Sequence, residues 1–313
     1  MGTAAALAVY ALAVAWCAPA LLTRLTARGI GAWLGLVTWL AAMASTLVSA
    51  ALALVFLIRT VRAGWPELTL AVCREVAGNA CTPVIYRSAL YEFGLAAVLF
   101  VASVTALAAA WRYGRKVQRS HRHTAEHGRA VRIVGRELPG TGAVVLEDSR
   151  PAAYCAAGTI VLTRGAIDVL DDAQLATVLA HERAHLSGHH HLIVVGVRGL
   201  AAAFPGVPLF GRGLGEVMRL SEMSADDAAV RVGDGRRAVL AAALVAIATG
   251  TAVPGESLLP RGALAAAAYA VQARVERMLR APSRSRGLAC VTLMAVATLA
   301  LALLPAALTT LTP

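Results

Sequence analysis

Four long apolar runs constrain this chain more than any other feature. Each is about 20 residues or longer, enough to cross the hydrocarbon core of a bilayer as a helix; they cover residues 3–22, 30–58, 90–111 and 288–308. Hydrophobic residues make up 58% of the chain and charged residues 15%, whereas soluble globular domains carry roughly 25% charged residues. The sequence therefore predicts an α-helical integral membrane protein whose polar chemistry lies between the runs.

The first two runs and the segment after them allow alternatives. A cleaved signal peptide is the alternative for the N-terminal run, but no basic residues precede it and a second run follows almost at once, so we favour a retained span. The polar segment 59–89 is interpreted as a loop. Its two cysteines, Cys73 and Cys81, either form a disulfide on an oxidising side of the membrane or remain free thiols.

Basic residues indicate the orientation. The densest basic stretch, residues 111–123, follows the third run, and positive charge beside a span stays in the cytoplasm. Counting spans from there, we expect a bacterial plasma-membrane protein with three spans in residues 1–111 and an extracytoplasmic segment 59–89. A cytoplasmic domain would fill residues 112–287, and a fourth span with a short C-terminus would fill 288–313.

The net charge of +11 also raises nucleic-acid binding as a possibility. The arginines mostly flank apolar runs, however, and no nucleic-acid-reading motif is present. Membrane topology accounts for the charge, with binding of anionic lipid as the alternative for residues 111–123. We expect the lipid bilayer as a partner and no direct nucleic-acid partner; the oligomeric state is undetermined.

The segment between the third and fourth runs predicts a mainly α domain with a small sheet, an α+β arrangement. Short β-branched or apolar stretches separated by glycine predict strands and a hairpin; they lie at 131–134, 143–146, 154–158 and 159–163. Asp171 and Asp172 are suitable N-caps for the next helix. Further helices are expected at 214–232, 236–249 and 263–280. The apolar segment 192–210 contains an arginine and two prolines, which favours a membrane-dipping or core segment over a full span.

The helix expected after Asp171 carries the residues best suited to chemistry. His181 and His185 are four residues apart, so they share one helix face and both imidazoles can reach one metal ion. Glu182 lies beside them. This H-E-x-x-H spacing is typical of zinc hydrolases, in which the glutamate is the general base. The alternative is a chance match on an ordinary helix.

A catalytic zinc usually has three protein ligands and an open position. Glu222 is the best third ligand, and Asp226, one turn further on, can orient a zinc-bound histidine. Alone, these acidic residues would be read as a solvated face. The sequence thus predicts one catalytic Zn²⁺ held by His181, His185 and Glu222, with Glu182 as the catalytic base.

Two neighbouring features are less specific. The strand at 159–163 is a candidate for holding an extended substrate by edge pairing. Histidines follow at positions 189, 190 and 191, but consecutive side chains on a helix point in different directions, so we expect no second metal site. No residue that would stabilise an oxyanion is identified.

Three stretches, Val178–His185, Gly158–Thr163 and Glu222–Asp227, together resemble the M56 family of membrane metallopeptidases, which includes the BlaR and MecR transducers. Three spans before the domain and one after it fit that family better than the related M48 group (HtpX and CAAX proteases). The resemblance implies a gluzincin domain that cleaves itself or a repressor. The transducers carry an external penicillin-binding sensor domain without a counterpart here, so beta-lactam sensing is not expected.

We therefore expect a membrane-embedded zinc metalloendopeptidase, regulatory in role, with a protein or peptide substrate such as a transcriptional repressor. The alternatives are a non-proteolytic membrane signalling or scaffold protein with a retained zinc site, and an M48 (HtpX-like) quality-control protease. A transporter is disfavoured because the four spans lack paired charged residues.

Overall fold

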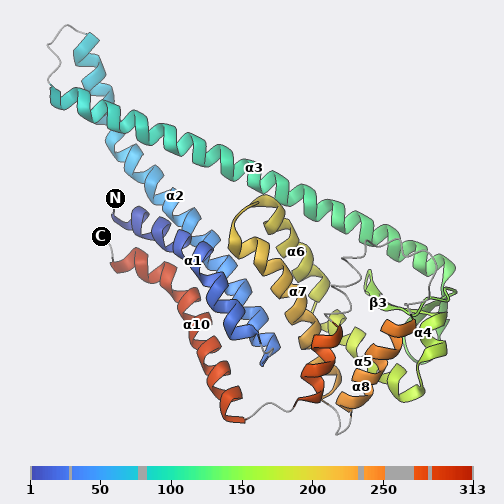
Figure 1. Cartoon of the computed structure of the whole chain (residues 1–313). Helices are drawn as coiled ribbons and strands as arrows, with labels where there is room; N and C mark the ends of the chain where they lie inside the picture. The colour runs from blue at the N-terminus through green and yellow to red at the C-terminus, as the bar shows by residue number, and fades with distance from the viewer. Residues whose placement is uncertain are drawn as a thin grey trace.

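Long helices form a bundle at one end of the protein, and a smaller α+β unit lies at the other end (Figure 1). The computed structural model describes residues 2–27, 30–76, 83–231, 236–250, 271–280 and 284–311. Helices α1 (Gly2–Thr26) and α2 (Ala32–Val76) pack against each other, and α10 (Arg284–Leu311) lies along them. The two termini lie near each other at the outer end of this bundle (Figure 1).

Among the described residues, four helices are long and apolar enough to cross a membrane, as predicted. Each contains an apolar window long enough for a span, and the four candidates are Gly2–Thr26, Ala32–Thr60, Ala96–Val134 and Gly287–Thr310. The interpretation of 59–89 as a loop was wrong, because its described residues continue α2 up to Val76 and begin α3 (Pro83–Val134). Arginine and glutamate are good helix formers, so polarity alone does not end a helix. Cys81 and the side chain of Cys73 lie outside the described residues, and their disulfide remains a prediction.

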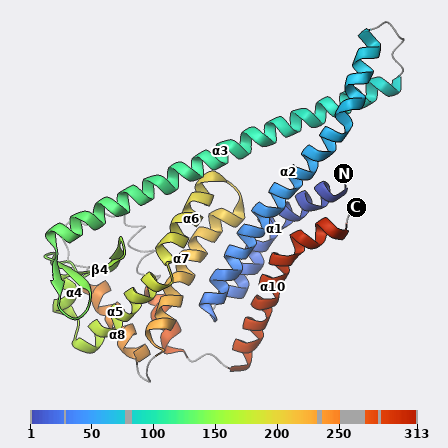
Figure 2. The ribbon, with the colours of Figure 1, turned by 180° about the vertical axis from the view of Figure 1, so that it is seen from behind.

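Helix α3 extends from the outer end of α2 to the sheet (Figure 2). The predicted strand at 131–134 was wrong, since these residues form the end of α3. Val131 packs the helix against the sheet in a cluster with Val144 and Val161, and this contact outweighs the β preference of the stretch. Gly135 follows; a Cβ there would lie 2.1 Å from Val144 Cγ1 and 2.7 Å from the Val131 carbonyl oxygen, so only glycine fits the close approach.

The sheet has four strands in the order β1-β2-β4-β3; these are β1 (Arg136–Leu138), β2 (Ala143–Leu146), β3 (Ala153–Ala156) and β4 (Thr159–Thr163). The predicted strand at 143–146 and the hairpin before residue 163 are confirmed, with β3 and β4 antiparallel and β2 and β4 parallel. The proposed substrate edge on β4 was wrong, because β4 is paired on both sides. The free edges in this sheet are β1 and β3.

Helices build the rest of the unit: α4 (Arg164–Val169), α5 (Asp172–Ser187), α6 (His190–Ala203), α7 (Pro208–Ala229) and α8 (Arg236–Gly250). Helix α8 was predicted almost in full. Helix α7 begins earlier than expected, with Pro208 at its first turn, where proline's missing N–H costs nothing. Of the helix predicted at 263–280, the described part is helical over 271–279.

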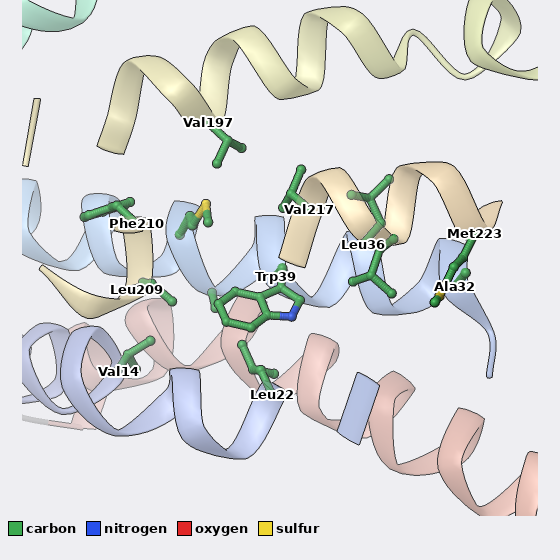
Figure 3. Close-up of a cluster of buried hydrophobic side chains, with 13 residues drawn as sticks. Val14, Leu22, Ala32, Leu36, Trp39, Val197, Leu209, Phe210, Val217 and Met223 are labelled. Atoms are coloured by element: carbon green, nitrogen blue, oxygen red, sulfur yellow. The ribbon is translucent and has the colours of Figure 1, made fainter. Parts of the chain in front are cut away.

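The largest apolar cluster joins the α6–α7 pair to the long helices (Figure 3). Trp39 of α2 is fully buried at its centre, surrounded by Leu22 of α1 and by Leu209 and Val217 of α7. A second cluster packs α5 and α8 on one face of the sheet. Helices α5 and α8 therefore pack on the sheet, whereas α6 and α7 pack on the membrane-type helices.

Candidate metal centre

Helix α5 brings the H-E-x-x-H residues to a buried position between the sheet and α7. Asp171 caps the helix, accepting from the Gln174 N–H, while the Gln174 side chain accepts from the Asp171 N–H. Val178 and Leu179 pack α5 on the sheet cluster. One turn later His181 is 5% exposed and Glu182 is 7% exposed. The cap and the apolar face thus determine which way the motif points.

Helix α7 brings Glu222 to the two histidines. The Nε2 atoms of His181 and His185 lie 3.1 Å apart. Glu222 places Oε2 3.6 Å from His181 Nε2 and Oε1 3.4 Å from His185 Nε2, and one ligand atom from each residue falls within 4.8 Å of the others. Tetrahedral zinc with nitrogen ligands at 2.0–2.1 Å requires neighbouring ligand atoms roughly 3.3 Å apart. These three residues fit one zinc ion.

Asp226 lies behind His181. Its Oδ1 is 3.1 Å from His181 Nδ1, close although not aligned as a full hydrogen bond. Burial opposes ionisation of Asp226, but the nearby His181 ring and the hydrogen bonds from Arg274 hold its pKa below the usual value. Burial likewise acts to lower the pKa of His181, yet Asp226 and Glu222 raise it to about 9. Zinc and a proton therefore compete for this histidine.

Arg274, which the sequence interpretation missed, connects the acidic residues of α7. It lies in the helical residues 271–279 and forms a bidentate pair with Asp226, with Nε 2.9 Å from Oδ2 and Nη2 bound to Oδ1. Its Nη1 lies 3.0 Å from Glu222 Oε2. No motif in the sequence points to this arginine, because it is far along the chain from both metal-site helices.

His190 was also missed. It is 3% exposed, and its Nδ1 lies 3.0 Å from Nδ1 of His185. His189, in the left-handed region at φ 50°, turns the chain so that the next side chain returns toward α5. A Cβ on Gly188 would lie 2.6 Å from His190 Nε2, so glycine is needed there. Burial, with His185 nearby, lowers the pKa of His190 to about 4, which keeps it neutral.

Cys155 of β3 contacts Glu182. Its Sγ lies 3.1 Å from Glu182 Oε2 and 3.3 Å from the Glu182 carbonyl oxygen. Burial raises the pKa of the Cys155 thiol, and the negative charge of Glu182 raises it further. The thiol is therefore a neutral hydrogen-bond donor that holds one oxygen of the glutamate and links the edge strand to the metal site.

Part of the chain is similar to a known peptidase family. The model of peptidase family M48 matches residues 117–207, which contain the sheet, α5 and α6 but end before Glu222. No curated protein and no solved structure gives a significant match to the chain. The match favours the M48 alternative, and the narrower M56 resemblance finds no support beyond the gluzincin motifs that both groups share. The arrangement of the four candidate spans therefore does not distinguish family M48 from family M56.

The metal site and the family match lead to the same activity. The match covers His181, Glu182 and His185, and the fold adds Glu222 as the third member of the His-His-Glu set. This donor set is that of a single catalytic zinc ion. Residues 117–207 therefore form a peptidase family M48 domain, and the chain is a zinc metalloendopeptidase with membrane-type helices.

Proposed function

We propose that the protein is a bacterial plasma-membrane protease that hydrolyses peptide bonds on the cytoplasmic side, with Glu182 as general base. The observation that carries this proposal is the buried meeting of His181, His185 and Glu222 directly beside Glu182. A bound Zn²⁺ would supply Lewis acidity toward a water molecule and the substrate carbonyl. Glu182 accepts a proton from the water and passes it to the leaving amine nitrogen, so that OH ends on the carbonyl carbon and H on nitrogen.

The residues behind the ligands hold them in position. With His185 binding through Nε2, its Nδ1 carries the proton and donates to the neutral His190. His181 likewise presents Nδ1–H to Asp226. Arg274 fixes Asp226 and balances the charge of Glu222. Such outer contacts orient metal ligands and raise their basicity.

The free edge of β3 is the best place for an extended substrate. In the described sheet β3 pairs with β4 along one edge only. The same strand carries Cys155, which contacts Glu182, so a peptide paired to that edge would pass beside the general base. Edge pairing binds main chain rather than particular side chains, which suits a protease with broad protein substrates.

Such a protease could cleave a regulator or remove damaged membrane proteins. Cleavage of a repressor rested on the M56 resemblance, whereas the match to family M48 supports an HtpX-like quality-control role. We therefore propose quality control of proteins near the membrane as the biological role.

The test compares the full-length protein with Glu182→Gln in detergent or nanodiscs, measuring zinc content, self-cleavage and cleavage of an unfolded protein. We expect the variant to retain zinc and to lose about 10²- to 10⁴-fold in rate, the usual contribution of a general base. Glu137→Gln, the same change at an exposed strand position, should leave the rate unchanged. Equal cleavage by wild type and Glu182→Gln, both with zinc, would favour the scaffold alternative.

A further inference from the structure

The connection between α6 and α7 forms an apolar tip. No charged residue occurs in the stretch 199–211, which Arg198 and Arg212 flank on either side. Phe204 and Phe210 stack across the connection with ring centroids 5.0 Å apart. Ala202 and Pro205 of the tip are exposed, as are both flanking arginines. We call residues 199–211 the hairpin tip.

The hairpin tip lies beside a candidate span. Helix α7 runs antiparallel to α2: a Cβ on Gly35 would lie 3.4 Å from Leu220 Cδ2, and a Cβ on Gly213 would lie 2.3 Å from Met43 Cε. Following α7 back toward its start therefore means moving further into α2. The tip lies past the level of Met43, which belongs to the span Ala32–Thr60.

The tip also shares its core with the spans. Leu209 and Phe210 are buried in one cluster with Trp39 and Met43 of α2 (Figure 3), and Phe204 packs against the same cluster. The sheet clusters contain none of these residues. The hairpin tip thus packs in the same apolar cluster as the membrane-type helices, while its residues Ala202 and Pro205 are exposed.

The length of α2 and the positions of the arginines together indicate how deep the tip lies. From Met43 to Thr60, the end of the span, α2 rises about 26 Å at 1.5 Å per residue, close to the roughly 30 Å of a hydrocarbon core. If the edge of the core lies near Met43, Arg212 lies there too, beside Gly213. Arginine at that edge extends its guanidinium to the headgroups. The segment beyond the arginine is uncharged, as the core requires.

We propose that the hairpin tip is inserted into the acyl-chain region of the leaflet on the metal-site side, with Arg198 and Arg212 at the headgroups. Lipid is the partner of its exposed face. Glu222 follows Arg212 by ten residues on the same continuous helix, so the third metal ligand is held about 15 Å from the headgroup level. The insertion anchors the metal-binding helix to the bilayer surface.

The experiment places a fluorescent label on Ala202→Cys in the full-length protein, in nanodiscs, with the reactive native cysteines replaced. Leu12→Cys, on the exposed face of α1, is the lipid control. Arg150→Cys, whose side chain is 75% exposed beside the sheet, is the water control. We expect acyl-chain doxyl lipids to quench the Ala202 label as strongly as the Leu12 label, and iodide to quench it several-fold less than the Arg150 label.

Two outcomes would overturn the proposal. Iodide quenching equal to that at Arg150 would place the tip in water. Quenching by neither agent would mean that protein covers the tip, and energy transfer between labelled copies would then identify a second copy of the chain. Pro205→Cys, also exposed, provides the same measurement if Ala202→Cys does not fold.

Discussion

At the scale of single residues, each histidine of the metal site has a buried partner on its far side. His181 has Asp226, and His185 has His190. One partner is an ion held by an arginine and the other is a neutral imidazole, so the two ligands are held by contacts of different kinds.

Arg274 provides a test of that arrangement. Arg274→Gln leaves Asp226, 1% exposed, without its bidentate cation and with the His181 ring still beside it, so the free energy of unfolding should fall by about 3–5 kcal/mol. The affinity for zinc should fall about 10- to 100-fold, the usual effect of losing an outer contact. Chemical denaturation and zinc competition with a chelator measure these effects.

Arg277→Gln is the matched control for Arg274→Gln. Arg277 lies in the same helical residues and pairs with Asp227, which is not among the metal-site residues. Zinc affinity should be unchanged in this variant. Equal losses in both variants would show that Arg274 acts only by holding the helix in place.

His190 gives a second prediction for the metal site. His190→Ala removes the acceptor of His185 Nδ1, so the affinity for zinc should fall about 10- to 100-fold. His191→Ala alters the exposed neighbour and should leave the affinity unchanged. If the two variants bind zinc equally well, the contact with His185 does not orient the ligand.

At the scale of elements, the position of the metal site depends on where α5 begins. Asp171 and Gln174 close the capping box at its first turn, while Asp172 is already helical. Capping satisfies N–H groups that have no partner inside the helix. The helix end and the buried face of Val178 together set the direction of the two histidines.

Asp171→Ala should therefore lower the free energy of unfolding by about 1 kcal/mol, the typical value of an N-cap. Asp172→Ala keeps the cap and loses only a favourable charge at the helix start, so its effect should be a few tenths of a kcal/mol. Denaturation curves of the two variants, measured side by side, separate the contribution of the capping hydrogen bonds from that of the charge at the helix start. Equal effects would mean that the box contributes nothing beyond charge.

At the scale of the whole molecule, the metal site bridges two kinds of surroundings. Helix α5 packs on the sheet, whereas α7 packs on α1 and α2. Arg219 of α7 also donates to the Thr26 carbonyl oxygen at the end of α1. The two histidines of α5 are thus held by packing on the sheet, and Glu222 of α7 is held by packing on α1 and α2. The site forms only where these two parts of the protein meet.

The proposed orientation is tested by reporters. Alkaline phosphatase fused after Pro313 should be active, because α10 would carry that end across the membrane, and a fluorescent protein there should be dark. The same reporters inserted after Gly140, in the exposed β1–β2 turn, should give the opposite pattern. A fluorescent fusion after Pro313 would contradict the four-span orientation.

The sequence by itself determined the spans, the zinc chemistry and the members of the His-His-Glu set. Spans follow from length and apolarity, which are local properties, and His181 with His185 follows from helical periodicity. Glu222 could be found because a catalytic zinc needs a third ligand. The local rule failed at 131–134, where packing of Val131 on the sheet overrode the β-branched pattern.

Only the tertiary structure decided what surrounds those ligands. Arg274 is 48 residues further along the chain than Asp226, which it contacts, and Cys155 contacts Glu182 because of the strand order. No sequence periodicity encodes either contact. The same holds for the edge strand, since β3 rather than β4 is free only because β2 pairs beside β4. Contacts between distant segments depend on how whole faces pack, and that packing is a property of the complete fold.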